Sequence, residues 1–315
     1  MSIHAALHSE IFGFYAVVTL AGVAGTGAVI ALLKWGFGTN VDHVVRAYRG
    51  WLMMLPALIF SIFLGRAVSI VFFTSIAMIA FKEFARATGL YRDWLMTTVV
   101  YLGIISAGVI SLVTDPHAHV PGWYGLFMAL PVYVIAVILI IPIARNRVRG
   151  QLQSLALSIV GFIYFGWMFG HLAFLTNAVH AYSYLLFLLF AVELNDIAAY
   201  ACGKFFGVHP LRSNVSPSKT WEGSLAALAV SMALPWLLRF TLHDFQPRDC
   251  LLTGLIVGVG GQLGDLAVSV IKRDLGIKDM GAFIPGHGGI LDRVDSLIYT
   301  APLFLHMIRY FHDLY

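Results

Sequence analysis

The sequence predicts an all-α fold: a polytopic helical membrane protein with about ten transmembrane helices joined by polar cytoplasmic loops. Of the 315 residues, 59% are hydrophobic and 11% are charged, whereas soluble domains carry about 25% charged residues. The mean hydropathy is +0.84. Apolar runs of about 20 residues, the length that crosses a bilayer, recur along the chain. The lipid bilayer is therefore the expected surrounding, and a soluble enzyme, a disordered chain or a nucleic-acid-binding domain fits poorly.

Each predicted span is an apolar run matched to a hydrocarbon core of about 30 Å. The spans lie at residues 11–33, 51–64, 67–81, 94–113, 123–143, 152–175, 182–203, 223–241, 251–271 and 290–311. The stretch 51–81 is divided because as one helix it would be about 46 Å long. Arg66 follows Gly65 in the middle of that stretch, and we place the turn there.

Lysine and arginine test the number of spans, because they concentrate in cytoplasmic loops. With ten spans, sixteen of the 20 lysines and arginines fall on one side of the membrane. They lie in loops 34–50, 82–93, 144–151, 204–222 and 272–289 and at Arg293. We expect that side to be the cytoplasm, with the chain in a bacterial inner membrane and both termini outside. A single span over 51–81 would move the first of these loops across the membrane and weaken the asymmetry.

Acidic residues divide the chain into a membrane scaffold, residues 1–180, and a catalytic region, residues 181–315. Ten of the sixteen acids lie between residues 193 and 295. Asp196 and Asp265 stand inside apolar runs, where an ionised carboxylate costs on the order of several kcal/mol unless it is paired, metal-bound or hydrated. One such acid is often a structural hydrogen-bonding group, whereas several together indicate a functional site.

The loop 213–223 combines hydroxyl groups, a lysine and the expected start of a helix near Trp221. Its polar side chains include Ser216, Ser218, Lys219, Thr220 and Glu222. Hydroxyl donors, an ammonium group and a helix N-terminus suit a phosphate group. An ordinary helix-capping loop has a similar composition, so the residues alone leave both interpretations open.

A second polar segment follows the span that contains Asp265. It carries Lys272, Arg273, Lys278, Asp279, His287, Asp292, Arg293 and Asp295. Cations alone would satisfy the positive-inside rule or contact anionic headgroups. The carboxylates among them, without cysteine ligands, suit a hard cation such as Mg²⁺, and lone His287 does not make a zinc site. Carboxylates with lysine and arginine are typical of nucleotide and phosphoryl chemistry.

The spacing within this segment resembles the signature of the phosphatidate cytidylyltransferase (CDP-diacylglycerol synthase) family. The similar strings are Ser269-x-Ile271-Lys272-Arg273, Lys278-Asp279-x-Gly281 and Ile284-Pro285-x-His287-Gly288-Gly289-Ile290-x-Asp292-Arg293-Val294-Asp295. Asn195-Asp196 and Ser216-Pro217-Ser218-Lys219-Thr220-x-Glu222-Gly223 also look like the family, although a basic or amide residue often replaces Ser218 there. The resemblance covers about residues 190–300, and residues 1–150 show no motif that aligns.

The resemblance implies transfer of a cytidylyl group from CTP to phosphatidate at the cytoplasmic membrane face, giving CDP-diacylglycerol and pyrophosphate. It implies that Asp265 and Asp292 bind Mg²⁺, with a second cation, such as monovalent K⁺, nearby. The catalytic candidates are Lys219, Lys272, Arg273, Lys278, Asp279, His287, Arg293 and Asp295. The substrate-binding candidates are Asn195, Asp196, Ser216, Ser218, Thr220 and Glu222. A homodimer is a candidate assembly, and no nucleic-acid partner is expected.

Three alternatives remain open at this point. Two are related enzymes: a CTP-dependent polyprenol or phytol kinase, and a cytidylyltransferase for another lipid phosphate. A kinase would release CDP, whereas nucleotidyl transfer releases pyrophosphate. The third is an ion-coupled transporter in which Glu193, Asp196 and Asp265 carry ions or protons. The concentration of acids near one end of the chain counts against a transporter built from two similar halves.

Overall fold

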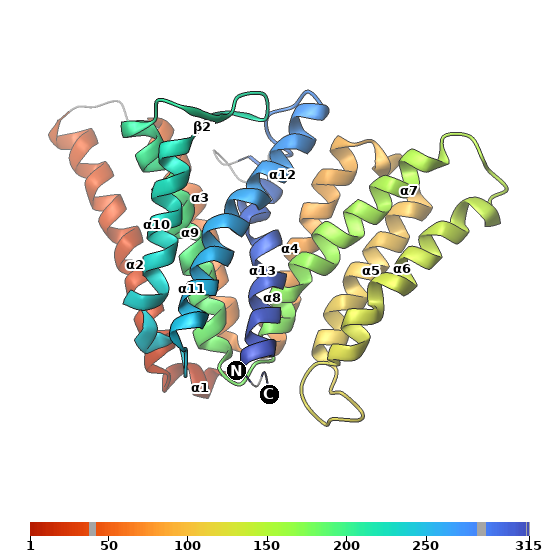
Figure 1. Cartoon of the computed structure of the whole chain (residues 1–315), viewed down its shortest axis with the longest axis horizontal. Helices are drawn as coiled ribbons and strands as arrows, with labels where there is room; N and C mark the ends of the chain where they lie inside the picture. Colours follow the sequence, from red (N-terminus) through yellow and green to blue (C-terminus); the bar gives the residue numbers. More distant parts are fainter. Residues whose placement is uncertain (38–41, 282–287, 313, 315) are drawn as a thin grey trace.

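The computed structural model describes residues 1–37, 42–281, 288–312 and 314, and these form a helical bundle (Figure 1). Within these described residues, seven helical segments are long and apolar enough to cross a membrane. They are Glu10–Gly36, Arg66–Ala87, Trp94–Leu112, Tyr124–Ala144, Gln151–Leu175, Ala181–Phe206 and Pro247–Asp274, and a shorter apolar helix covers Tyr48–Leu64. The predicted polytopic helical membrane fold is confirmed.

Most elements of the bundle correspond to the predicted spans. The first half contains α1 (Ile3–Leu7), α2 (Glu10–Ala31), the π-helical turn η1 (Leu32–Gly36), α3 (Asp42–Leu64), α4 (Arg66–Ala87), the 3₁₀ turn η2 (Leu90–Arg92), α5 (Trp94–Leu112) and α6 (Tyr124–Ala144). A continuous helix follows as α7 (Gln151–Val160), π-helical η3 (Gly161–Met168) and α8 (Phe169–Leu175). The second half contains α9 (Ala181–Phe206), β1 (Pro210–Arg212), β2 (Ser216–Thr220), α10 (Trp221–Leu237), η4 (Arg239–Thr241), α11 (Pro247–Leu255), π-helical η5 (Ile256–Gly260), α12 (Gly261–Asp274) and α13 (Leu291–Phe311).

The stretch 51–81 is divided as predicted. Gly65 separates α3 from α4 with φ of +107°, a conformation that residues with a Cβ rarely adopt. The Arg66 guanidinium then donates to the carbonyls of Ser111 and Leu112, at 2.9 and 2.8 Å, and so joins α4 to the end of α5. The first helix of this pair starts at Asp42 rather than residue 51, because a helix continues beyond its apolar run whereas hydropathy marks only that run.

The loop 213–223 differs from the expected irregular connection. Strands β1 and β2 pair antiparallel, with Pro210 opposite Thr220 and Arg212 opposite Ser216. Helix α10 begins at Trp221 as predicted, and the Thr220 hydroxyl caps it by accepting from the backbone N–H of Gly223 at 3.2 Å. The capping interpretation is therefore correct for Thr220.

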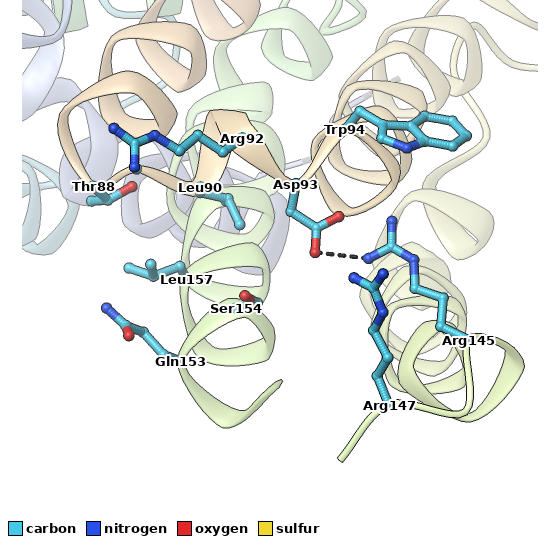
Figure 2. Close-up of a pocket in the computed structure, with 11 residues that line it drawn as sticks. Thr88, Leu90, Arg92, Asp93, Trp94, Arg145, Arg147, Gln153, Ser154 and Leu157 are labelled. Atoms are coloured by element: carbon cyan, nitrogen blue, oxygen red, sulfur yellow. Dashed lines mark hydrogen bonds and ion pairs between the residues drawn. The ribbon is translucent and has the colours of Figure 1, made fainter. Parts of the chain in front are cut away.

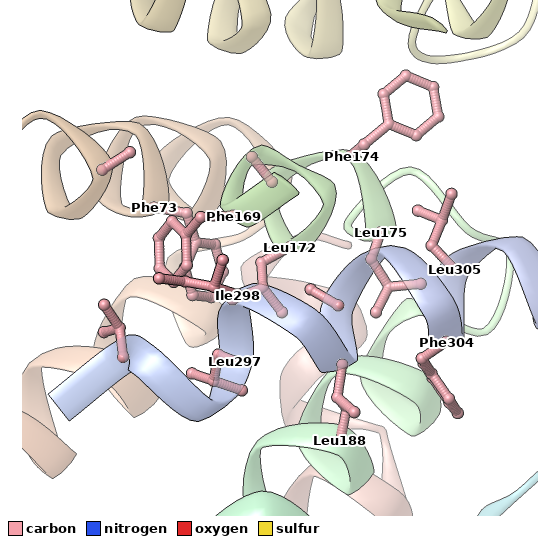
Figure 3. Packing of buried hydrophobic residues seen from close by; sticks show 14 of the residues in the cluster. Phe73, Phe169, Leu172, Phe174, Leu175, Leu188, Leu297, Ile298, Phe304 and Leu305 are labelled. Atoms are coloured by element: carbon pink, nitrogen blue, oxygen red, sulfur yellow. The ribbon is translucent and has the colours of Figure 1, made fainter. Parts of the chain in front are cut away.

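Helix α13 lies at the centre of the bundle, against α4, α8, α9 and α12. Figure 3 shows this packing, which buries Phe73, Phe169, Leu172, Leu175, Leu188, Leu297, Ile298, Phe304 and Leu305. Close van der Waals packing of this kind holds membrane helices together, because lipid is as apolar as the side chains themselves. The beginning of α13, which carries several candidate site residues, is thus fixed from several sides.

The two ends of the bundle differ in what they carry. Both termini lie at one end in Figure 1, together with the connection between α5 and α6. The hairpin β1–β2 and the end of α12 lie at the other end, where the α6–α7 connection is also found. This arrangement agrees with the predicted separation of the termini from the basic loops.

Candidate active site

Polar side chains from four elements meet at the end of the bundle that carries the hairpin. They come from the second half of α9, from β2, from α12 and from the first turns of α13. Asn195, Asp196, Lys219, Asp265, Lys272, Asp292 and Asp295 are the predicted site residues that this arrangement brings together. These seven residues, spread between positions 195 and 295, therefore lie close together in the structure.

The Lys219–Asp265 ion pair connects the hairpin to α12. The Lys219 ammonium lies 2.5 Å from Oδ2 of Asp265, and the side chains are 23% and 30% exposed. Ser269, one turn further along α12, donates to the other oxygen of Asp265 at 3.2 Å. Because the pair is partly open to solvent, a ligand can reach Asp265 without unfolding the site.

The Lys272–Asp292 pair is buried and holds the start of α13 against α12. The atoms Lys272 Nζ and Asp292 Oδ1 are 3.0 Å apart, and the Asp292 side chain is only 3% exposed. Oδ2 of Asp292 accepts from the backbone N–H groups of Met280 and Gly289, each at 3.0 Å. Asp292 therefore also binds the chain after α12, at Met280, and just before α13, at Gly289.

Asp196 and Asn195 connect α9 to its neighbours. Ser296 of α13 donates to both carboxylate oxygens of Asp196, at 3.3 and 3.1 Å. Buried Asn195 accepts from the Ser231 hydroxyl of α10 at 3.0 Å. Three helices are thus joined through hydrogen bonds made by two adjacent residues.

The carboxylate of Asp295 completes the cluster on α13. It lies near Asp196, Asp265 and Lys272. The backbone carbonyl of Asp295 rests against Gly264 of α12, where a Cβ would collide with it. Close approach of α12 and α13 therefore depends on Gly264, as expected for small residues between membrane helices.

Several predicted site residues make other contacts. Arg273 donates to the carbonyls of Val215 and Ile277, at 3.3 and 3.2 Å, and so supports the hairpin. Lys278 and Asp279 are exposed near the end of α12. Arg293 is half-buried, and its Nε has no hydrogen-bond partner among the described residues. His287 lies outside the described residues.

The remaining candidates lie on strand β2 and at the start of α10. Ser216 is half-buried and Ser218 is exposed on β2. Glu222 accepts from Nδ1 of His209 at 2.6 Å and from its backbone N–H at 3.2 Å. The hydrogen bond from the His209 side chain is the main cause that lowers the pKa of Glu222 to about 2. Its ionised carboxylate therefore fastens the segment before β1 to the start of α10.

Glu83 of α4 is a site residue that the sequence analysis missed. Its two carboxylate oxygens accept from the backbone N–H groups of Ile290 and Leu291, at 3.0 and 2.9 Å. Buried Glu83 thus places a negative charge at the N-terminus of α13, where the helix dipole favours it. In the sequence it stands between Lys82 and Arg86, a pattern typical of an exposed helix end. The one feature of the sequence that could have drawn attention to Glu83 is that acids are rare before residue 190.

The donor chemistry of this cluster fits a hard divalent cation. No group of three His, Cys, Asp or Glu side chains in the described residues is close enough to hold a metal alone. Mg²⁺ needs only one or two protein carboxylates, because water and substrate phosphates supply its other ligands. Asp265 and Asp292 each have a lysine ammonium as counter-ion, which shows that both sites favour a cation. Asp265 is the more accessible of the two.

Comparison with known proteins extends the similarity over most of the chain. The model of the cytidylyltransferase family matches residues 45–311. The uncharacterized protein YnbB of Escherichia coli (strain K12) is 37% identical over 216 residues, which are 61% of this chain and 72% of that protein. The phosphatidate cytidylyltransferase of Staphylococcus aureus (strain COL) is 33% identical over 244 residues, 76% of this chain and 89% of the relative. That of Staphylococcus haemolyticus (strain JCSC1435) is 30% identical over 254 residues, 80% and 92% respectively.

The match corrects one sequence-based expectation. The resemblance was expected to cover about residues 190–300, whereas the family match begins at residue 45. Motifs are recognised by polar and glycine positions, and apolar spans conserve helix packing with interchangeable side chains. The part predicted as scaffold also reaches the site, through Glu83. The chain therefore belongs to the cytidylyltransferase family and is a nucleotidyltransferase of that family.

Proposed function

We propose that this protein transfers a cytidylyl group from CTP to phosphatidate, giving CDP-diacylglycerol and pyrophosphate. The observation that carries the proposal is the pair of ion pairs, Lys219–Asp265 and Lys272–Asp292, at one end of a membrane bundle. A reaction between two polyanions needs cations to hold the phosphates and carboxylates to hold a metal ion. Membership of the family and relatives named phosphatidate cytidylyltransferase support the same activity.

In this proposal Asp265 and Asp292 hold Mg²⁺, and a second cation such as K⁺ binds nearby. When bound, Mg²⁺ supplies positive charge that offsets the charge of the triphosphate. The groups that contact the phosphates of CTP and of the lipid are Lys219, Lys272, Arg273, Lys278 and Arg293. Lys219 and Lys272 are well suited to this role, because each already lies beside a carboxylate that a metal ion would neutralise.

The hydroxyl groups of the hairpin are proposed to bind phosphate. Ser216, Ser218 and Thr220 follow one another along β2 and the start of α10. The Thr220 oxygen accepts from Gly223, so its proton stays available for donation. Glu222 orders this segment through His209, and Asn195 and Asp196 order α9 beside it.

The chemical step needs no protein base. An oxygen of the phosphatidate phosphate forms a bond to the α-phosphorus of CTP, while the bond from that phosphorus to the bridging oxygen breaks. Pyrophosphate leaves with the electron pair of the broken bond. A phosphate dianion is already a nucleophile, so Asp279 and Asp295 are assigned to orienting cations. His287, from the same motif, is proposed to contact phosphate.

The reaction is proposed to take place at the cytoplasmic face of a bacterial inner membrane. Sixteen of the 20 lysines and arginines lie in the five basic loops and at Arg293, and such loops face the cytoplasm. CTP is soluble and phosphatidate is a lipid, so a site at headgroup level can be reached by both. The relatives compared above are bacterial proteins.

Labelled CTP distinguishes this activity from its alternatives. The purified chain is incubated with phosphatidate, Mg²⁺ and CTP carrying the label on either the α- or the γ-phosphorus. We expect the α-label in the lipid product and the γ-label in pyrophosphate. Transfer of the γ-label to the lipid with release of CDP would identify a lipid kinase. Incorporation with another lipid phosphate but not with phosphatidate would correct the substrate.

A further inference from the structure

A cavity of about 720 Å³ lies apart from the residues of the candidate active site, where α4, α5, α6 and α7 end or begin. It is lined by Thr88, Gly89, Leu90, Arg92, Asp93, Trp94, Arg145, Arg147, Gln153, Ser154 and Leu157. None of these residues has a role in the proposed reaction. The residues that line it come from the α4–α5 connection, the α6–α7 connection and α7 (Figure 2).

The lining has an excess of positive charge. It contains three arginines and one aspartate. Asp93 is already occupied, because its Oδ2 pairs with Arg145 at 2.8 Å and its Oδ1 accepts from the N–H of Met96 at 3.3 Å. Figure 2 shows Arg145 and Arg147 extending from the α6–α7 connection towards Asp93. Arg92 and Arg147 are both exposed, so their guanidinium groups are accessible to an anion.

The backbone holds these arginines in place. Arg147 donates its backbone N–H to the carbonyl of Pro142 at 3.0 Å, and the preceding residue, Asn146, has φ of +48°. On the other side, the short turn η2 ends at Arg92 and is fixed by a hydrogen bond from Asp93 N to Leu90 O at 2.8 Å. Two ordered turns therefore place arginines around one cavity. Arg147 lies beside Arg145, whereas Arg92 extends the other way (Figure 2), and a guanidinium group such as that of Arg147 suits phosphate oxygens.

Exposed apolar side chains surround the same region. Trp94 is 69% exposed at the start of α5, Ile143 is 78% exposed near the end of α6, and Leu152 is 81% exposed at the start of α7. Tryptophan is enriched where membrane spans meet the headgroups. A soluble phosphate compound would gain nothing from these side chains, whereas a lipid would place its acyl chains against them.

We propose that this cavity binds the phosphate headgroup of an anionic phospholipid, at a site separate from the candidate active site. Arg147 holds the phosphate, while Arg145, beside it, stays paired with Asp93 (Figure 2). The three arginines of the lining surround one cavity. In this they differ from basic residues that are spread along a loop and only satisfy the positive-inside rule.

Trp94 gives a local readout for the test. The full chain is placed in two kinds of phosphatidylcholine nanodisc. One contains a small fraction of phosphatidylglycerol that is brominated near the glycerol end of its acyl chains. The other contains the same fraction of phosphatidylcholine brominated at the same position. Subtracting the fluorescence of Trp94→Phe isolates quenching of Trp94 from that of the other tryptophans. We expect brominated phosphatidylglycerol to quench Trp94 several-fold more than brominated phosphatidylcholine at the same fraction. Equal quenching by both lipids would overturn the proposal.

Arginine variants test the assigned contacts. In Arg147→Gln we expect the apparent affinity for phosphatidylglycerol to fall on the order of tenfold, as for loss of charge-assisted hydrogen bonds. Arg149→Gln is the matched control, because Arg149 is exposed in the same connection but does not line the cavity. Equal loss in the control would show general attraction to the headgroup layer and refute the site.

Two further arms keep the test decisive. If Arg147→Gln does not fold, Arg147→Lys is measured instead. Loss of the bidentate guanidinium contacts should lower the preference for phosphatidylglycerol, whereas an unchanged preference would refute the contact. Added inorganic phosphate should leave the Trp94 quenching unchanged. Recovery of fluorescence with phosphate would identify a site for soluble anions and overturn the lipid assignment.

Discussion

The two carboxylates assigned to the metal ion have different surroundings. Asp265 is partly exposed and makes one ion pair and one hydrogen bond from a hydroxyl group. Asp292 is buried and accepts from two backbone amides in addition to Lys272. Loss of either charge leaves a lysine without its partner, and for Lys272 this happens in a buried place, where an unpaired charge is costly. We therefore expect Asp265 to act mainly in the chemistry, and Asp292 to act both in the chemistry and in holding the fold.

Neutralising either carboxylate should remove most activity. We expect Asp265→Asn and Asp292→Asn each to lower kcat by about 10²-fold, because groups that stabilise transition-state charge have effects of this size. Only Asp292→Asn should also lower the Tm, since it releases the segment before α13. Asp274→Asn, an exposed acid at the end of α12, is the control and should keep its activity. Near-normal turnover in Asp265→Asn would rule out its role at the metal ion.

Glu83 provides a second test at the level of one side chain. In Glu83→Gln an amide replaces a carboxylate that accepts two backbone N–H groups, and one side of the amide can only donate. We expect a loss of about 1–3 kcal/mol in the free energy of unfolding, seen as a lower Tm in detergent, with reduced turnover. Lys82→Gln changes the exposed neighbour and should leave the Tm unchanged. An unchanged Tm in Glu83→Gln would contradict the anchoring role.

Among the elements, the hairpin β1–β2 depends most on contacts from elsewhere. Its two strands contain three and five residues, and an isolated hairpin of this size is marginal in water. Here Lys219 pairs with α12, Arg273 donates to Val215, and Glu222 binds His209. The hairpin is therefore positioned by polar contacts at both ends, which makes its order sensitive to charge.

The Glu222 contact predicts a dependence on pH. Because the folded protein lowers the pKa of Glu222 from 4.5 to about 2, its contribution to stability is present above pH 4.5 and is lost as the pH falls towards 2. The difference in Tm between the unmodified chain and Glu222→Gln should shrink over this interval. The Tm of both proteins in detergent between pH 6 and 2.5 measures it. A constant difference over the whole interval would contradict the assignment.

At the scale of the molecule, the basic loops and the candidate site share one end of the bundle. The termini and the connection 113–123 lie at the other end (Figure 1). Arg66, at that second end, donates to backbone carbonyls of Ser111 and Leu112. The Arg66 guanidinium thus caps the carbonyls at the end of α5, and we do not count it among the residues that set the orientation of the chain in the membrane. The distribution of the other basic residues should then decide which face is cytoplasmic.

Cysteine labelling in intact cells measures this orientation. After the native Cys202 and Cys250 are replaced, single cysteines are introduced as Ala118→Cys and Val148→Cys, both at exposed positions. We expect an impermeant thiol reagent to reach position 118 from outside and position 148 only after the cells are opened. The reverse pattern would overturn the proposed topology and move the site to the outer face.

The order of residues was sufficient for the membrane fold, the division at Gly65 and the recognition of the family. These follow from local properties: hydropathy over about 20 residues, the conformational freedom of glycine, and polar groups at fixed spacing. The partners within the site, such as Lys219 with Asp265 and Glu83 with the start of α13, depended on three-dimensional contacts. So did the cavity around Arg92 and Arg147. Such pairings join residues far apart along the chain, and they exist only once helix packing has brought the ends of separate helices together.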